Sequence, residues 1–382
     1  MMKTLGYYLF ALVYNLCRPF PIIKKRVLCI MTHDDGEASN VRIAARAMQD
    51  KNAGYTFSYI TKSNTQAVKS SAGLRSLISF FFRKPYEMAR AEIVLLDNIF
   101  LPYAYLHRKK NTKIVQLWHG TGSIKKFGQD VNVGKLKVLE QRANNNVTHL
   151  IVNSLAMKKM YAGAFGIREE HIYPIGLPKT DELLARIREI EATHRNHYKE
   201  YIYHKYKIPN NKKLILYAPT FRDEELENPK VVEYVKEICR ELPEDYYIGI
   251  RLHPFIAAAF GDKELSNPRI CQFSFESDVN TLLLASDLLI TDYSSIIFEY
   301  CLTGRPMIFF AYDYAEFSDH GRGFYHNYMD YVPGTVAYST QEVIDAIKAK
   351  EFHQNSIKGF LEDNYAFLDG KASERLIELM QK

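Results

Sequence analysis

The sequence lacks an apolar run long enough to cross a membrane. No stretch reaches the 18 consecutive apolar residues that a spanning helix needs. The apolar, aromatic stretch from Leu5 to Cys17 is shorter and has no small-x-small cleavage motif, so it does not indicate a signal peptide. Basic residues flank it, so we expect residues 1–25 to form an amphipathic segment that associates with an anionic membrane surface. A helix packed in the core would show the same pattern.

Cysteine pairs, zinc motifs and dense basic tracts are also missing. The five cysteines are scattered without a C-x-x-C pair, which excludes a disulfide framework or zinc knuckle and fits a reducing cytoplasm. The 12 histidines include no H-E-x-x-H motif, so no metal site or cofactor is predicted, although Mg²⁺ is compatible with phosphate chemistry. The net charge of +6 suits phosphate-rich ligands. The sequence has no dense Lys/Arg stripe, which argues against nucleic-acid binding.

The first half of the chain alternates buried strands with helices. A length of 382 residues suggests two domains, and 47% hydrophobic residues indicate a folded protein. One helix is predicted over Ser39 to Asp50, and another starts at Ser154. The predicted strands are Arg26 to Thr32, Tyr55 to Thr61, Ile93 to Asp97, Ile114 to Leu117 and Leu150 to Asn153. This βαβ series predicts a doubly wound parallel sheet.

A second alternating series follows a charged segment, Lys179 to Lys207, which we expect to be one long helix. Its predicted strands are Leu214 to Tyr217, Tyr246 to Arg251, Ile270 to Phe273, Leu288 to Thr291 and Met307 to Phe310. We therefore predict an α/β protein with two Rossmann-like parallel-sheet domains, residues 26–177 and 178–382, facing a cleft. This is the GT-B architecture.

One strand-to-helix junction has the features of a phosphate site. Ser294 and Ser295 lie between the strand Leu288 to Thr291 and a predicted helix, Ile296 to Leu302. Ligands of open α/β sheets bind at such junctions, where free N–H groups favour phosphate. Glu299 follows about one turn later and is placed to accept ribose hydroxyls. The alternative is an ordinary N-cap pair with a surface glutamate.

A glycine-rich loop follows the strand that ends at Leu117. It contains the only tryptophan, Trp118, directly before His119. A histidine at this sheet edge can accept a proton from an attacking hydroxyl. The loop continues through Gly120, Thr121, Gly122, Ser123 and Lys125, where glycines allow close backbone approach and Lys125 can neutralise phosphate. The alternative is a buried, hydrogen-bonded histidine at a turn.

Polar residues also follow two strands of the second half. Pro219, Thr220 and Arg222 come after the first of these strands, and Arg251 and His253 end the next. Strand ends of one parallel sheet converge, so these groups can bind a diphosphate and stabilise a leaving nucleotide. Taken alone, either group is equally a surface ion-pair partner.

Two further segments have competing interpretations. In the segment that starts at Gly176, we expect Asp181 to cap the charged helix and Lys179 to face a ligand. After the first strand, Asp34, Asp35 and Glu37 resemble a metal loop, but their spacing does not match a calcium site. The alternative there is a capped helix start.

The order of these motifs resembles the CDP-glycerol glycerophosphotransferase family of wall teichoic acid synthesis. They read W-H-G-T, G-L-P-K-T-D, A-P-T-F-R-D, R-L-H-P and D-Y-S-S-I-I-F-E-Y, between about Gln116 and Gly334. The resemblance implies catalytic roles for His119 and His253. It also implies donor contacts at Thr121, Lys179, Thr220, Arg222, Arg251, Ser294, Ser295 and Glu299. The sequence departs from the family in two places. It has Gly122-Ser123-Ile124-Lys125 where the family has Pro-Leu-Lys, and Lys179 where the family has Arg. These departures leave the identity of the transferred polyol open.

The resemblance implies a peripheral enzyme on the cytoplasmic face of the membrane. It would move glycerol phosphate from CDP-glycerol to an undecaprenyl-diphosphate-linked disaccharide and release CMP. The chain length resembles the primase more than the longer polymerases. CDP-ribitol transfer and short-chain polymerisation remain alternatives, as do a UDP-sugar transferase or epimerase of the same fold and a non-catalytic protein that binds a lipid-linked precursor. The sequence does not indicate an oligomeric state.

Overall fold

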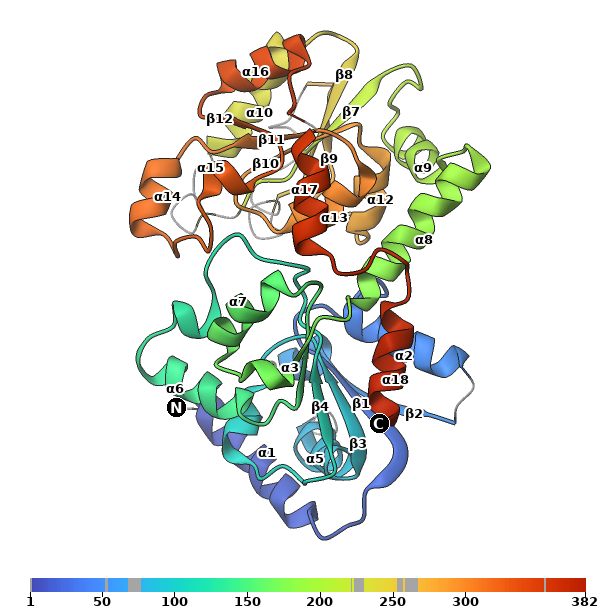
Figure 1. The fold of residues 1–382 in the computed structure, drawn as a ribbon, viewed down its shortest axis with the longest axis vertical. Coiled ribbons are helices and arrows are strands. Elements are labelled where there is room, and N and C mark those ends of the chain that lie inside the picture. Colours follow the sequence, from blue (N-terminus) through green and yellow to red (C-terminus); the bar gives the residue numbers. More distant parts are fainter. Residues whose placement is uncertain are drawn as a thin grey trace. The chain divides into compact units, whose positions relative to one another are not determined.

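The computed structural model describes residues 2–51, 54–67, 77–220, 222, 230–252, 257, 267–353 and 355–382. The chain forms two compact units (Figure 1). Unit 1 comprises Met1–Gly122, Lys126–Glu182 and Asn364–Lys382, and unit 2 comprises Ser123–Lys125 and Leu183–Asp363. These units differ from the expected domains, 26–177 and 178–382, in three respects: residues 178–182 and the C-terminal 19 residues belong to unit 1, and a three-residue loop segment belongs to unit 2.

Unit 1 contains a six-stranded parallel sheet in the order β2-β1-β3-β4-β5-β6. Its strands are β1 (Ile23–Met31), β2 (Thr56–Thr61), β3 (Ala91–Leu96), β4 (Lys113–Gln116), β5 (His149–Ile151) and β6 (Ile172–Tyr173). Five of these match the predicted strands, and β6, only two residues long, was missed because it is too short to show a pattern. The strand order changes direction between β1 and β3.

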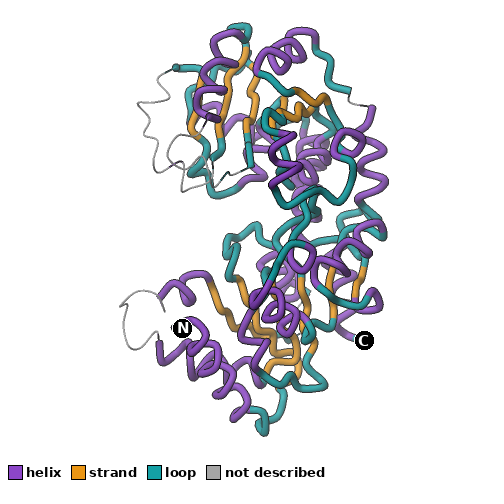
Figure 2. The backbone as a smooth tube through the Cα atoms, turned by 90° about the vertical axis from the view of Figure 1, so that its left-hand side faces the viewer, coloured by secondary structure: helices purple, strands orange, loops and turns teal. Residues whose placement is uncertain are grey.

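Helices flank this sheet (Figures 1 and 2). They are α1 (Met2–Cys17), α2 (Asn40–Asp50), α3 (Lys62–Ala67), α5 (Lys84–Ala89), α6 (Gly134–Asn144), α7 (Ala156–Phe165) and α18 (Ala372–Gln381). Short helical turns are η1 (Ser79–Arg83), η2 (Leu101–Tyr105), η3 (Gly128–Asp130) and η4 (Glu169–His171). Val27, Cys29 and Met31 of β1 pack with α2 and α18 in one apolar cluster. Alternation along β1 directs Leu28 and Ile30, also buried, to the opposite face.

Unit 2 repeats this design with the strand order β12-β11-β10-β7-β8-β9, again all parallel. The strands are β7 (Lys213–Tyr217), β8 (Tyr246–Ile250), β9 (Ile270–Gln272), β10 (Leu288–Thr291), β11 (Met307–Phe310) and β12 (Thr335–Ala337). The helices are α9 (His197–Lys205), α10 (Lys230–Glu241), α12 (Val279–Ala285), α13 (Ile296–Tyr300), η7 (Cys301–Thr303), α14 (Tyr314–His320), α15 (Tyr328–Tyr331), α16 (Thr340–Ala349) and α17 (Asn355–Asn364). The order changes direction between β7 and β10. The prediction of two Rossmann-like parallel-sheet domains is confirmed.

The charged segment after Lys179 is not one helix, as predicted. It forms α8 (Pro178–Thr193) and then α9, and His194 between them has a φ of +53°. A non-glycine residue in the left-handed region interrupts α-helical geometry. The break allows Asn196 to cap α9 by accepting the Lys199 N–H.

Asp181 does not cap the charged helix, which corrects a second expectation. Its two carboxylate oxygens accept the N–H groups of Ala372 and Ser373, at 2.9 and 2.7 Å, so it caps α18. Gly176 makes room for this docking. Its φ is +87°, and an added Cβ would lie 2.9 Å from the Ala372 Cβ. A capping partner nearly 200 residues away in sequence cannot be recognised from local spacing.

Helix α1 buries one face and exposes the other. Phe10, Ala11 and Tyr14 are buried in unit 1. On the other face, the side chains of Leu5, Tyr8, Leu12 and Leu16 are each more than half exposed. The segment is therefore a core helix with an exposed apolar line, and its association with a membrane stays a prediction. No helix among the described residues is long and apolar enough to span a bilayer.

Candidate active site

Each unit has a group of polar side chains where its strand order changes direction. In unit 1 the neighbouring strands β1, β3 and β4 are followed by His33, Asp97 and His119. In unit 2 the neighbouring strands β7 and β10 are followed by Thr220 and Asp292. Carboxyl ends of parallel strands form the ligand-binding edge of open α/β sheets, most of all at such a switch point.

A buried aspartate organises the switch point in both units. Asp97 directly follows β3, and its carboxylate accepts three backbone N–H groups of the loop after β1, at 2.8–3.0 Å, from Thr32, His33 and Asp34. Asp292 directly follows β10, and both its oxygens accept the Thr220 N–H after β7, at 2.8 and 3.0 Å. Both carboxylates are only 1% exposed. The same device therefore holds the first loop of each sheet in place, and sequence reasoning assigned it in neither unit.

The backbone at His119 is held in an unusual conformation. The preceding residue, Trp118, has a φ of +55°, which is uncommon for a side chain of that size. Its indole is fixed by ring contacts with Phe127 and Phe165, at centroid distances of 5.6 and 5.0 Å. The carbonyl of His119 accepts the Lys179 Nζ at 3.2 Å. Lys179 therefore supports the histidine loop within unit 1, and its predicted donor contact stays a prediction.

The ring of His119 is oriented by one hydrogen bond. Nδ1 lies 3.1 Å from the carbonyl oxygen of Asp97. A carbonyl only accepts, so Nδ1 carries the proton and Nε2 keeps a free lone pair. Burial, with the neighbouring His33 and Lys179, lowers the pKa of His119 to about 3. The ring is therefore neutral near pH 7, the form that can accept a proton.

His33 stacks on His119 and was not predicted as a site residue. The two ring centroids are 3.7 Å apart and the rings are inclined by 17°. Burial lowers the pKa of His33 as well. The sequence did contain a signal, since His33 directly follows the first strand pattern as His119 follows another.

We expect the His119 site to make the protein sensitive to mild acid. Its folded pKa of about 3 lies below the ordinary value of 6.5, so the unfolded chain binds the proton first. Its contribution to stability is complete above pH 6.5 and is lost as the pH falls towards 3, by about 1.4 kcal/mol per pH unit. Urea unfolding at several pH values should show a steeper loss for the wild type than for His119→Asn. Parallel curves for the two proteins would contradict the assignment, and His171→Asn serves as the control.

The loop after His119 begins in unit 1 and continues in unit 2. Gly120, Thr121 and Gly122 belong to unit 1, where Thr121 is buried and its carbonyl accepts the Asn153 Nδ2 at 3.1 Å. Ser123 and Lys125 belong to unit 2. The Ser123 Oγ donates to the Lys125 carbonyl at 2.5 Å, which forms a tight turn.

Lys125, a predicted phosphate ligand, lies beside Thr220 in unit 2. Its Nζ is 3.4 Å from the Thr220 Oγ1, and its backbone bridges that of Phe324. Burial lowers the pKa of Lys125 to about 8, while Asp292 favours the charged form and Arg222 opposes it. The ammonium is mostly protonated at pH 7, in a setting where an additional anion is favourable.

Arg222 is committed to carboxylates of the protein. It forms two 2.9 Å hydrogen bonds to Asp313 and one of 2.5 Å to Asp292. Its guanidinium carbon also lies 5.2–5.6 Å from the ring centroids of Tyr293, Tyr312 and Phe317. Arg222 thus holds the strand ends of unit 2 together, and its direct contact with a donor stays a prediction.

The other predicted residues of unit 2 lie at the same edge of its sheet, except where they fall outside the described residues. Pro219 is partly buried beside Thr220. Arg251 directs one nitrogen to the carbonyl of Glu276 at 2.8 Å. His253 lies outside the described residues.

Ser294 and Ser295 precede α13, and both residues are partly buried. The helix has five residues before it tightens into η7, so its dipole is small and its free N–H groups are the main attraction for an anion. Glu299 is 8% exposed, less open than a ribose contact suggests, and that contact stays a prediction.

The acidic loop after β1 is the start of a helix. Ser39 caps α2 by accepting the Arg42 N–H, and the Asp34 carboxylate accepts the Gly36 N–H at 3.0 Å. Among the described residues, no cluster of three or more His, Cys, Asp or Glu side chains is arranged to hold a metal ion. The Ser39 cap supports the interpretation of the loop as a capped helix start.

Comparisons with known proteins place this geometry in one family. Residues 12–382 match the family described as CDP-Glycerol:Poly(glycerophosphate) glycerophosphotransferase. The teichoic acid poly(ribitol-phosphate) polymerase of Bacillus spizizenii is 31% identical over 98% of this chain, and the chain spans 59% of that polymerase. The teichoic acid glycerol-phosphate primase of Bacillus subtilis is 31% identical over 78% of this chain and 75% of the primase.

Solved structures agree in fold. The wall teichoic acid polymerase TagF, in a histidine variant soaked with CDPG, has a TM-score of 0.80 and 26% identity over 98% of this chain and 93% of that chain. A UDP-GlcNAc 2-epimerase from Neisseria meningitidis bound to UDP-GlcNAc has a TM-score of 0.62 and 13% identity over 93% of this chain and 99% of that chain, which shows the fold alone. The predicted GT-B-like class is therefore confirmed.

Proposed function

Because this chain belongs to the CDP-glycerol:poly(glycerophosphate) glycerophosphotransferase family, we propose that it is an enzyme that transfers glycerol phosphate from CDP-glycerol to an acceptor hydroxyl. The acceptor proposed is an undecaprenyl-diphosphate-linked disaccharide, as for a primase. The observation that carries the proposal is the neutral, oriented imidazole of His119 at one switch point. The cation Lys125 stands at the other, beside Thr220. Ribitol phosphate is the second candidate, because the relative aligned over 98% of this chain is a ribitol-phosphate polymerase.

The reaction is an in-line displacement at the β-phosphorus of the donor. The acceptor oxygen forms a bond to that phosphorus while the bond to the bridging oxygen breaks, and CMP leaves with the bond electrons. Nε2 of His119 takes the acceptor proton, since Nδ1 is occupied by the Asp97 carbonyl. His33, stacked on the same ring, holds it in place and disfavours its protonation before substrate binds.

Unit 2 is the proposed donor-binding unit. Lys125 and the backbone N–H groups behind Ser294 and Ser295 attract the diphosphate, and Arg251 with His253 neutralises the charge that develops on CMP. Glu299 is proposed to contact the cytidine ribose. Asp292 fixes the Thr220 loop and is not proposed to contact the ligand, since both its oxygens accept hydrogen bonds from protein donors.

Lys125→Gln should weaken donor binding. A charge-assisted hydrogen bond to phosphate contributes about 1.5–3 kcal/mol to binding, so its loss should lower the affinity for CDP-glycerol by about 10- to 100-fold. Lys126→Gln is the matched control, because Lys126 is the next residue, carries the same charge and is exposed. Isothermal titration with CDP-glycerol measures both. Equal affinities of the two variants would remove Lys125 from the donor site.

We also propose that the protein works as a peripheral enzyme at the cytoplasmic face of the membrane. The support is the exposed apolar line of α1, formed by Leu5, Tyr8, Leu12 and Leu16 at helical spacing. A lipid-linked acceptor is confined to the bilayer surface, so a protein that binds this surface meets it at a higher local concentration.

The proposed function is tested by donor choice and product. Purified protein should release CMP from CDP-glycerol in the presence of a short-chain lipid-linked disaccharide, and less or none without this acceptor. CDP-ribitol and UDP-N-acetylglucosamine are the comparison donors. Faster release from CDP-ribitol would select the second candidate, and turnover of the UDP-sugar alone would favour an epimerase. No CMP from either CDP-polyol would indicate a binding protein instead.

A further inference from the structure

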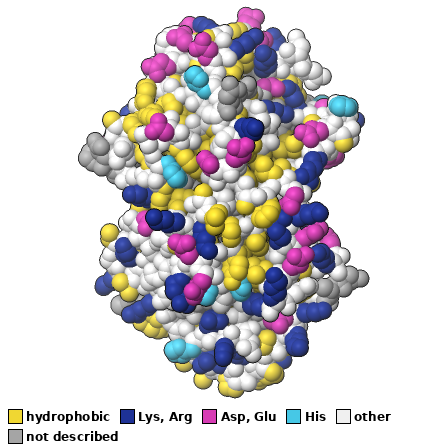
Figure 3. Space-filling model, in the orientation of Figure 1, with side chains coloured by type: hydrophobic (Ala, Val, Ile, Leu, Met, Phe, Trp, Pro, Cys, Tyr) yellow, Lys and Arg dark blue, Asp and Glu magenta, His cyan; other side chains and the backbone are white. Residues whose placement is uncertain are grey.

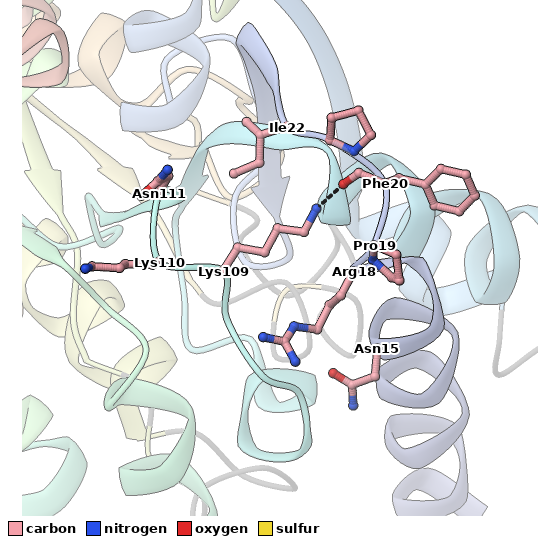
Figure 4. A pocket seen from close by; sticks show the side chains of 9 residues that line it. Asn15, Arg18, Pro19, Phe20, Ile22, Lys109, Lys110 and Asn111 are labelled. Atoms are coloured by element: carbon pink, nitrogen blue, oxygen red, sulfur yellow. Dashed lines mark hydrogen bonds between the residues drawn. The ribbon is translucent and has the colours of Figure 1, made fainter.

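A basic pocket lies where α1 turns into β1 in unit 1 (Figure 4). It is an open cavity of about 570 Å³ formed by two chain segments, residues 15–22 and 109–111. The two segments are joined by hydrogen bonds. The Asn15 side chain accepts the His107 N–H at 3.1 Å, and the Lys109 Nζ donates to the Phe20 carbonyl. The pocket is therefore built by the fold rather than by a single mobile loop.

The pocket holds positive charge without a matching carboxylate. Arg18, Lys109 and Lys110 line it, and its lining contains no Asp or Glu. Among the described residues, none of these three forms an ion pair with an acidic side chain. Burial lowers the pKa of Lys109, and the nearby Arg18 and Arg90 lower it further. Figure 4 shows Lys109 and Arg18 reaching into the space between the two segments. An anion there would relieve this repulsion.

This pocket is separate from the His119 site. Its segments precede β1 and β4, whereas His33 and His119 follow these strands. At about 3.3 Å per residue, the eight residues from Asn111 to His119 put the pocket on the order of 25 Å from His119, at the opposite edge of the sheet. A ligand in the pocket is therefore not in contact with the reacting groups.

The exposed apolar line of α1 leads directly to the pocket. Leu12 and Leu16 lie on the exposed face of α1, and Phe20 follows three residues after the helix ends at Cys17. The three side chains are 56%, 68% and 48% exposed. Phe20 also lines the pocket. Basic side chains are spread over the visible face of the molecule (Figure 3). In the pocket, three of them line the same cavity as Phe20. An apolar strip ending at uncompensated cations matches a lipid, with acyl chains beside a phosphate.

We propose that the basic pocket of Arg18, Lys109 and Lys110 binds the phosphate of an anionic phospholipid headgroup, while Leu12, Leu16 and Phe20 contact its acyl chains. This inference rests on the proposed membrane association and assigns the headgroup phosphate to one pocket, part of which, Lys109 and Lys110, lies outside the N-terminal segment. The pocket would hold unit 1 on anionic bilayers while leaving the opposite sheet edge free for the acceptor.

Vesicle sedimentation of the full chain tests the proposal. The variant R18Q/K109Q removes two pocket cations, and K51Q/K371Q removes two exposed cations of the same unit. Each cation at an anionic surface contributes about fivefold in affinity, so the pocket variant should bind phosphatidylcholine–phosphatidylglycerol vesicles more than about 10-fold more weakly than the wild type. The control should lose less than about threefold. On pure phosphatidylcholine, the wild type and both variants should bind alike.

Three outcomes would overturn the proposal. Equal losses in both variants would show a diffuse charge effect, and unchanged binding of R18Q/K109Q would show that the pocket holds no lipid. A free-phosphate site would be identified instead if inorganic phosphate raises the melting temperature of the wild type but not of R18Q/K109Q, and also displaces the wild type from vesicles. CMP release with a soluble acceptor should be the same for R18Q/K109Q and the wild type. This readout separates failure of the pocket from failure of the proposed function, which would abolish release by the wild type itself.

Discussion

His119→Ala is expected to lower turnover by about 10²- to 10⁴-fold, the usual contribution of a positioned general base. Donor affinity should change by less than about threefold, because the donor is proposed to bind through unit 2. The variant keeps the backbone that Lys179 and Asn40 hold from the neighbouring segments. CMP release at saturating donor and acceptor measures turnover, and titration calorimetry measures donor affinity.

The matched control is His149→Ala. His149 is another partly buried histidine of the same sheet, stacked on Tyr173 with a centroid distance of 5.0 Å, and burial lowers its pKa to about 4. It starts β5 and so lies at the other edge of the sheet. Its removal should affect stability but not turnover. Normal turnover by His119→Ala, or an equal loss in both variants, would exclude His119 as the base.

Arg222→Met is expected to destabilise unit 2 by about 3–5 kcal/mol. The guanidinium neutralises two carboxylates, the buried Asp292 and the partly buried Asp313, whose side chains are 2% and 13% exposed. Removing one partner of a buried ion pair leaves charge without compensation, which is the costly case. Methionine keeps much of the apolar contact with Tyr293 and Phe317. Urea unfolding followed by far-UV circular dichroism measures the loss.

Two further variants separate this effect from a general loss of charge. Arg240→Met removes an exposed arginine whose one ion pair within the described part of the chain is with its neighbour Glu241, so it should cost less than about 1 kcal/mol. The double variant Arg222→Met/Asp313→Asn should recover part of the stability, because it removes one of the stranded charges. A loss in Arg222→Met no larger than in Arg240→Met would show that the network is not structural.

Local patterns were sufficient to predict most of the framework. The strands β10 and β11 have the predicted bounds, because short apolar runs between polar turns are typical of buried parallel strands. His119 and Thr220 were found as well, since polar residues after such runs lie at the ligand-binding edge.

Three features could not be obtained in this way, because each depends on contacts between distant segments. Asp97 was read as the end of a strand, yet its function is to bind the loop 65 residues earlier. Asp181 has the spacing of a local helix cap but caps α18. Arg222 has two carboxylate partners, Asp292 and Asp313, that its local sequence does not indicate, and its contact with a donor stays a prediction. The sequence shows the chemistry of each of these side chains, but it does not show which distant residue each one binds.

The return of the C-terminal helix to unit 1 limits how this protein can be divided. Leu376, Ile377 and Met380 complete an apolar cluster with Val41 and Met48 near the other end of the chain. No single cut yields two intact halves, since a fragment that stops after Glu182 would expose the surface these three side chains cover. Expressing unit 1 separately therefore requires a rearranged gene in which α18 is joined directly behind Glu182. The intervening segment, Leu183–Asp363, is then the part to express as unit 2.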